Sequence, residues 1–113
     1  MNEHRMTLDA EYFEKIENGT KTVELRLYDE KRRQIRLGDI ILFNRKGERD
    51  VLRTRVVGLC TAPSFAVLLS DGALLARALP CADSLEAQQL LRRFYTEADE
   101  ARWGVVGIEI KLE

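Results

Sequence analysis

The sequence predicts an α+β fold, a small antiparallel or mixed β-barrel with flanking helices. Three observations support this class. A short helical pattern is followed by strand-like segments, then by further helical patterns, and one alternating strand ends the chain. Short turns rather than helical crossovers join the strands, which favours antiparallel pairing. Because closing a sheet removes its exposed edges, a small barrel is the expected architecture.

Length and composition predict one soluble domain over residues 1–113. The chain is 45% hydrophobic and 33% charged, with a formal net charge of -1, and a domain of roughly 100–200 residues holds a single core. The N-terminus carries charges where a secretory signal is apolar, and no apolar run approaches the ~18 residues that span a bilayer. We therefore expect a cytoplasmic protein that does not enter the membrane.

The first half of the chain predicts one helix and three strands. Asp9 caps the helix, and Asn18-Gly19 supplies a left-handed stop. The first strand alternates strictly, with Val23 and Leu25 on the core face. In order, the elements are a helix over 9–18, a strand over 22–28, and strands over 40–43 and 51–59 around a hairpin loop at 44–48.

The second half predicts helices and a closing strand. Ser64 caps a short helix that ends near Asp71-Gly72, and Ser84 caps a longer one. A buried stripe on the longer helix consists of Leu90, Leu91 and Phe94. Residues 96–99 have the form of a capping box, and residues 105–112 alternate as a final strand. Both helices are expected to pack on the sheet.

Several common catalytic chemistries lack their residues here. His4 is the single histidine and falls in an N-terminus expected to be mobile, so catalysis that needs a held imidazole is disfavoured. Cys60 and Cys81 lack metal-ligand spacing and are expected to be small buried thiols in the reduced state. No glycine-rich phosphate loop is present. We expect no metal and no cofactor.

Charged residues gather on one face of the 22–28 strand. Glu24 and Arg26 leave that face about 7 Å apart, and Lys21 stands just before it, after Gly19. Such a trio can hold a phosphate and read a base edge or a sugar hydroxyl, or transfer protons if burial shifts the pKa values. An exposed ion pair on a strand gives the same pattern. The pattern alone leaves these interpretations open.

Positive charge is concentrated in the first half of the chain. Residues 21–55 contain eleven Lys or Arg against six Asp or Glu, whereas residues 59–113 contain five against eight. This asymmetry permits one basic face on a nearly neutral body. A solvated surface explains it equally well.

Three segments together resemble the ASCH domain (activating signal cointegrator homology), a family of the PUA-like superfamily. They are Gly19-Thr20-Lys21-Thr22-Val23-Glu24-Leu25-Arg26, Leu37-Gly38-Asp39-Ile40-Ile41-Leu42-Phe43 and Trp103-Gly104-Val105-Val106-Gly107-Ile108-Glu109. The resemblance spans nearly the whole chain in the family's order. It implies a PUA-like β-barrel with flanking helices and a cleft where the G-x-K-x-x-E-x-R residues converge.

The resemblance implies binding of RNA or a nucleotide-like ligand. The implied contacts are Lys21, Glu24 and Arg26, with Gly19 permitting the turn. A stacking ring on Tyr28 and a basic connection of Lys31, Arg32 and Arg33 are expected to assist them. Trp103 can either stack on a base or plug the core before the last strand, and a core plug is the expected role.

An enzyme using the same cleft is the alternative. It would be a metal-independent hydrolase of RNA or a modified nucleoside, with Lys21 and Glu24 as the catalytic candidates and Arg26 stabilising negative charge. The subgroup that resembles N4-acetylcytidine amidohydrolases has a threonine nucleophile where this chain has Glu24, so that activity is not transferred. A protein-interaction module is the third class considered.

Overall fold

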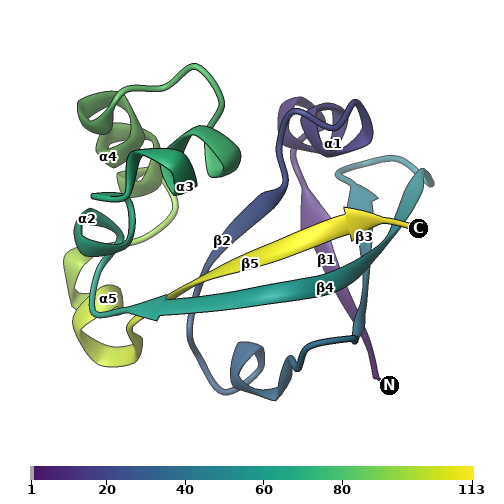
Figure 1. Cartoon of the computed structure of the whole chain (residues 1–113), viewed down its shortest axis with the longest axis horizontal. Coiled ribbons are helices and arrows are strands. Elements are labelled where there is room, and N and C mark those ends of the chain that lie inside the picture. The colour runs from purple at the N-terminus through teal and green to yellow at the C-terminus, as the bar shows by residue number, and fades with distance from the viewer. Residues whose placement is uncertain (1) are drawn as a thin grey trace.

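The computed structural model describes residues 2–113, and among them five strands form one curled sheet. The strand order is β1-β3-β4-β5-β2, so β1 and β2 are the two edges of a half-barrel (Figure 1). β1 pairs with β3 in parallel, and the other pairs are antiparallel. The strands are β1 (Glu3–Leu8), β2 (Val23–Leu27), β3 (Ile40–Arg45), β4 (Val51–Ala62) and β5 (Val105–Leu112). The predicted α+β class, a barrel-like sheet with flanking helices, is confirmed.

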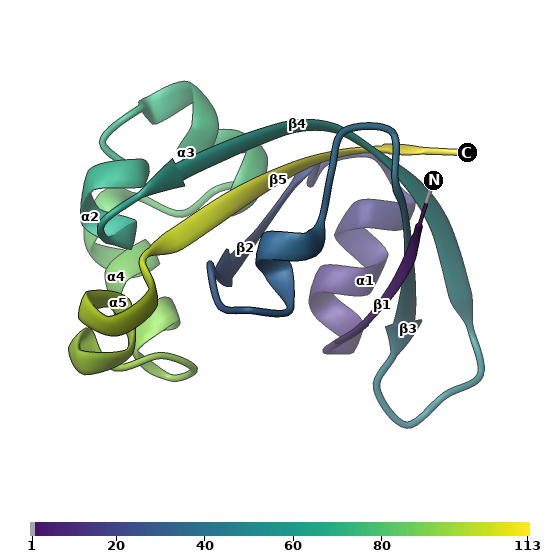
Figure 2. The same cartoon turned by 90° about the horizontal axis from the view of Figure 1, so that it is seen from below.

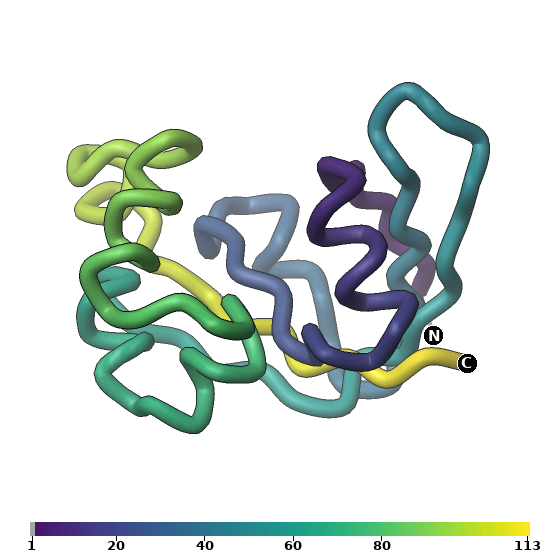
Figure 3. Tube along the Cα trace, turned by 90° about the horizontal axis from the view of Figure 1, so that it is seen from above, coloured from purple at the N-terminus to yellow at the C-terminus, as the bar shows by residue number. Residues whose placement is uncertain are grey.

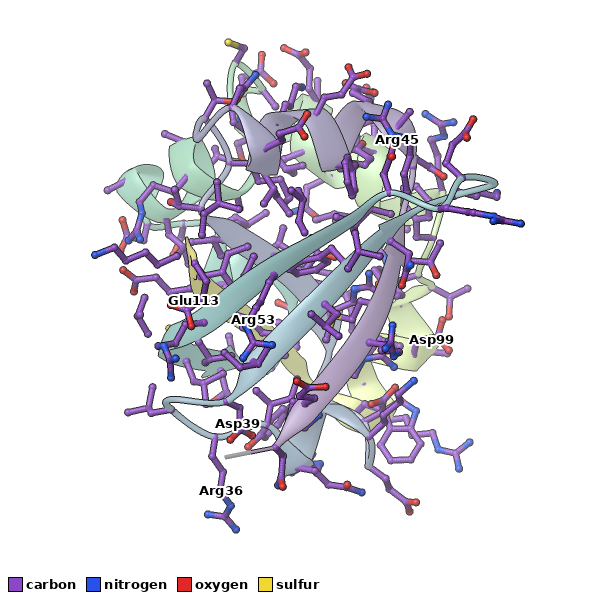
Figure 4. The ribbon with its side chains drawn as sticks, turned by 90° about the vertical axis from the view of Figure 1, so that its right-hand side faces the viewer. Arg36, Asp39, Arg45, Arg53, Asp99 and Glu113 are labelled. Carbon is purple, nitrogen blue, oxygen red and sulfur yellow. The ribbon has the colours of Figure 1, made fainter. Side chains whose placement is uncertain are left out.

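β1 is a strand that the sequence analysis missed, and the expectation of a mobile N-terminus was wrong. Met6 and Leu8 alternate into the core. His4 Nε2 lies 2.8 Å from Asp39 Oδ2. Asp39 also accepts hydrogen bonds from the backbone N–H groups of Asn2 and Arg36. Figure 4 labels Asp39 and Arg36 at this end of the sheet. The buried Asp39 carboxylate thus fixes the start of β1 to the turn before β3.

The helices occupy two places relative to the sheet. α1 lies inside the curl of the sheet. α2 to α5 gather where β4 ends and β5 begins (Figures 2 and 3). The elements are α1 (Ala10–Glu17), the 3-10 helix η1 (Arg32–Gln34), α2 (Phe65–Leu68), α3 (Gly72–Ala78), α4 (Ser84–Arg92) and α5 (Glu97–Trp103).

Side-chain caps explain where α2 to α5 begin, whereas Asp9 stands at the N-cap of α1 as predicted but its side chain makes no capping hydrogen bond. Ser64 caps α2 as predicted, and the capping box formed by Thr96 and Asp99 opens α5. Asp71 was expected near a helix end, but its carboxylate accepts from two backbone N–H groups and starts α3. Asp83, rather than Ser84, caps α4 by accepting from the N–H of Glu86.

Two hydrophobic cores lie on opposite sides of β2. One lies inside the curl and contains α1 and the inner face of β5, and the other packs α2, α3 and α4 against Val23 and Leu25. Because both faces of β2 are covered, Glu24 is as buried as its apolar neighbours. The interpretation of its face as an exposed ion-pair surface is therefore wrong.

Three predicted buried side chains are exposed. Phe94 follows the end of α4 and is 51% exposed, although Leu91 of the same predicted stripe is buried. Cys60 and Cys81 are also exposed. Cys60 lies opposite Gly107, which brings no side chain to cover it, and Cys81 lies between α3 and α4 in the left-handed region with φ 69.

None of the helices described is both long and apolar enough to cross a bilayer.

Candidate functional site

A tight turn carries the chain from α1 into β2 and places the motif residues. Gly19 has φ +83, and a Cβ there would meet nothing within 4 Å, so glycine serves the backbone conformation rather than a close contact. The N–H of Gly19 donates to the carbonyl of Ile16, and the N–H of Lys21 donates to the carbonyl of Lys15. Lys21 thereby enters the protein interior directly from the turn.

Lys21 is held entirely by internal partners. Its Nζ donates to the carbonyls of Val23 and Ala78, each at 2.7 Å, and lies 3.3 Å from Glu24 Oε1. These partners account for the three N–H donors of an ammonium group. With only 3% of its surface exposed, Lys21 joins the end of α3 to β2 and orients Glu24.

Arg26 completes the charged network from the other side of Glu24. Its Nε donates to Glu24 Oε2 at 2.8 Å, and its Nη2 donates to the Thr7 carbonyl at 3.2 Å. A guanidinium has five N–H donors, so hydrogens remain after these two bonds to described residues. Each Glu24 oxygen also keeps acceptor capacity, because one protein donor approaches each.

Opposing effects set the charge states in this network. Burial acts to raise the pKa of Glu24, but the charges of Lys21 and Arg26 outweigh it and hold that pKa below its ordinary value. Burial lowers the pKa of Lys21, while Glu24 acts in the opposite direction. Glu24 is thus an ionised acceptor at neutral pH.

The network lines a pocket of about 150 Å³ between the two edge strands. Residues 7–9, at the end of β1, and Tyr12 of α1 form one wall. Lys21, Glu24 and Arg26 form the charged part of the lining. The remaining wall is largely apolar or aromatic and consists of Leu25, Leu79, Leu90, Leu91, Phe94 and Tyr95.

The sequence analysis missed the aromatic rings of this pocket. Tyr12 and Tyr95 are partly buried, and burial raises the pKa of each hydroxyl. The Tyr95 ring packs against Phe65 with a centroid separation of 5.4 Å. The sequence analysis assigned Phe94 to a buried stripe with Leu90 and Leu91 and gave Tyr12 and Tyr95 no role in a site.

The other predicted contacts lie outside the pocket lining. The Arg33 guanidinium covers the Tyr28 ring at 4.3 Å from its centroid and donates to the Trp103 carbonyl. Arg32 pairs with Asp29 at 3.1 Å, and Lys31 is exposed. Trp103 is half-buried at the end of α5 and belongs to neither core, so its prediction as a core plug was wrong.

The site offers one cation with free hydrogens, one buried anion with free lone pairs and a ring-lined apolar space. This combination can receive a planar polar ligand and bind its edge. Between residues 2 and 113, no three or more His, Cys, Asp or Glu side chains gather as potential metal ligands.

Comparisons with known proteins agree with this architecture. The half-barrel sheet with helices at one end defines a PUA-like protein, and the ASCH domain family model matches residues 6–113. The chain therefore belongs to the ASCH family. No functionally curated protein matches it.

Solved structures extend the likeness. The crystal structure of hypothetical protein PH0355 has a TM-score of 0.87 and 40% identity, with 100% of both chains covered. The solution structure of protein PF0455 from Pyrococcus furiosus has a TM-score of 0.76 and 40% identity, covering 97% of this chain and 96% of that one. The ASCH domain from Lactobacillus crispatus JV V101 shares the fold, with a TM-score of 0.69, 13% identity and coverage of 98% and 79%.

Proposed function

We propose that this protein binds RNA by taking one unpaired nucleotide, or a nucleotide-like ligand, into the pocket between β1 and β2. ASCH family members are generally thought to bind RNA. The observation that carries the proposal is the Glu24–Arg26 pair, buried in a ring-lined apolar pocket with hydrogen-bonding capacity left on both partners.

The pocket volume supports a single base as the occupant. A cavity of roughly 150 Å³ with apolar walls admits a benzene-sized ring, and the volume here is about 150 Å³. A base pair or a whole nucleotide is larger than this space. The sugar and phosphate of a bound nucleotide would consequently remain at the mouth, and the base must be unpaired to enter.

Arg26 and Glu24 are the proposed ligand contacts, and Lys21 supports them. Arg26 donates to a base carbonyl or a phosphate oxygen, and Glu24 accepts from an exocyclic amine or a ribose hydroxyl. The three N–H donors of Lys21 are already directed at the carbonyls of Val23 and Ala78 and at the Glu24 carboxylate. Lys21 acts by orienting Glu24 rather than by gripping phosphate.

The basic connection contributes attraction rather than specificity in this proposal. Lys31 is exposed, and Arg32 acts electrostatically on Tyr95 of the pocket wall. Charges in this position raise the local concentration of a phosphate backbone without reading sequence.

The hydrolase alternative has weaker support from the geometry. Burial lowers the pKa of Lys21, as proton transfer at neutral pH requires. However, its ammonium is enclosed by three acceptors and is only 3% exposed. A ligand in the pocket therefore contacts Arg26 and Glu24 more readily than the enclosed ammonium group of Lys21. A protein-interaction module would leave the Glu24–Arg26 pair unused.

Binding of labelled single-stranded RNA and of nucleoside monophosphates to the purified protein tests the proposal. Arg26→Lys keeps the charge but loses the planar fork, and we expect it to weaken binding at least tenfold. Arg49→Ala, in the exposed turn between β3 and β4, is the matched control and should bind normally. Thermal melting of each variant checks that it is folded under the binding conditions. Equal affinity of Arg26→Lys and the unaltered chain would refute the proposal, and cleaved RNA on a denaturing gel would favour the hydrolase.

A further inference from the structure

Phe94 combines two properties that a core residue does not have. It lines the motif pocket, yet 51% of its surface is exposed. Its ring centroid lies 6.4 Å from that of Tyr95, with the planes tilted by 50°. Tyr95 is more buried and packs inward on Phe65. The two rings therefore line the same pocket, with Tyr95 in its inner part and Phe94 at its mouth.

The turn that carries Phe94 is held in place by hydrogen bonds. The backbone N–H groups of Phe94 and Tyr95 both donate to the carbonyl of Leu91, at 3.0 and 2.9 Å. Arg92 donates to the Tyr95 carbonyl at 2.9 Å and to the buried Glu100 carboxylate at 2.7 Å. These hydrogen bonds fix the backbone on both sides of the turn, so the position from which the exposed ring projects is preorganised.

Arg93 directly precedes Phe94 in the chain and carries a positive charge. Its side chain is exposed and has no ion-pair or hydrogen-bond partner among residues 2–113. Burial raises the pKa of Tyr12 on the opposite wall, and the Arg93 charge acts against that rise. Arg93 therefore lies close enough to the α1 side of the pocket for its charge to be felt there.

We propose that Arg93 and Phe94 form a second subsite that binds the nucleotide next to the one whose base enters the pocket. Phe94 stacks on the neighbouring base, and Arg93 contacts the phosphate between the two nucleotides. An aromatic face accepts any base, and a guanidinium complements a phosphate. The occupant is a single strand of RNA, because a duplex presents neither an unpaired base to the pocket nor a free base face to Phe94. This inference rests on the proposed function of the pocket.

The test compares short and long ligands on the same variants. The probes are nucleoside 5′-monophosphates and a fluorescein-labelled single-stranded RNA of about eight nucleotides, a length within the range that one small domain covers. Because Phe94 also lines the pocket, Phe94→Ala should weaken the oligonucleotide about tenfold and the mononucleotides by a smaller factor. An equal loss for both probes would place Phe94 in the pocket alone and overturn its stacking role. Arg93→Ala should weaken the oligonucleotide and reduce its salt dependence. Leu85→Ala, at the start of α4 and 69% exposed, is the matched control for loss of an exposed apolar side chain.

The outcomes separate this subsite from the pocket itself. If the unaltered chain binds the oligonucleotide and both Phe94→Ala and Arg93→Ala bind it equally well, the second subsite is refuted while the pocket stands. Annealing the RNA to its complement should abolish the Phe94 dependence, and undiminished duplex binding would also overturn the subsite. If the unaltered chain binds neither probe, the proposed function and this inference both fail.

Discussion

Arg26 in β2 is hydrogen-bonded to the Thr7 carbonyl in β1, which joins the two edge strands of the sheet through a side chain. The Nη2–O distance is 3.2 Å, and the same guanidinium donates from Nε to Glu24 at 2.8 Å. No backbone ladder links β1 to β2 in the described sheet. The side chain proposed to bind ligand therefore also bridges the open side of the half-barrel.

Replacing Arg26 by lysine should loosen this side of the fold. The variant loses the fork that reaches Glu24 and Thr7 together, and each lost bond to a charged group costs about 1.5–3 kcal/mol. We expect faster hydrogen exchange for backbone amides near the end of β1, while amides in the β4–β5 ladder keep their rates. Uniformly faster exchange along all strands would instead indicate global destabilisation and contradict a local bridge.

Removal of the Lys21 ammonium should destabilise the protein strongly. Lys21→Ala leaves the Glu24 carboxylate partly unpaired in a buried site, at a cost of about 3–5 kcal/mol, and urea unfolding measures this free energy. Combining Lys21→Met with Glu24→Gln removes both charges and should recover part of the loss. Lys46→Ala, whose side chain is 75% exposed, is the control. A loss below 1 kcal/mol in Lys21→Ala, on the scale of surface ion pairs, would show that the network is not structural.

The acid stability of the fold should depend on Asp39. Burial acts to raise its pKa, but hydrogen bonds from His4 and from two backbone N–H groups lower it from 3.8 to about 2. A depressed folded-state pKa gives stability that is present above the unfolded value and is lost as the pH falls through the folded value. The window is therefore about pH 4 to pH 2, and the contribution is about 2 kcal/mol.

Asp39→Asn removes this titration and tests the assignment. The variant should be less stable at neutral pH, and its free energy of unfolding should fall less steeply across the same acidic window. Urea unfolding at a series of pH values measures both. An unchanged slope in Asp39→Asn would assign the acid sensitivity to other carboxylates.

RNA affinity should depend only modestly on salt. The chain has a formal net charge of -1, and the proposed site has a few cations at its mouth rather than a long basic track. For about two neutralised phosphates on a single strand, affinity should fall about sevenfold from roughly 50 to 200 mM salt. Fluorescence anisotropy at several salt concentrations measures the slope. A loss of a thousandfold would point to a much larger basic surface than this pocket.

The sequence predicted the elements whose signal is local and missed those that depend on tertiary contact. The alternation after Gly19 predicted β2, and the cap at Ser64 predicted α2. β1 was missed because its charged residues mask the alternation of Met6 and Leu8, and its pairing with distant β3 is parallel. Asp71 was read as a helix end because an Asp-Gly pair fits a turn as well as an N-cap.

The site was predicted in part for the same reason. Lys21, Glu24 and Arg26 are close in sequence, so strand geometry alone brings them together. Part of the remaining wall comes from α1, which precedes the motif. The rest includes the end of α4, which lies about seventy residues further along the chain. No local pattern could show that Phe94 would face this pocket instead of the core, since a helical stripe does not identify its partner.

The most direct test of a ligand site between β1 and β2 is chemical-shift mapping of the ¹⁵N-labelled protein during titration with nucleoside 5′-monophosphates. The account predicts saturable shifts at Tyr12, at Leu25 and Arg26 of β2, and around Leu91 and Tyr95. Saturable shifts confined to the outer face of β4 would contradict it. A titration that produces no shifts, with a protein that binds RNA, would also contradict it.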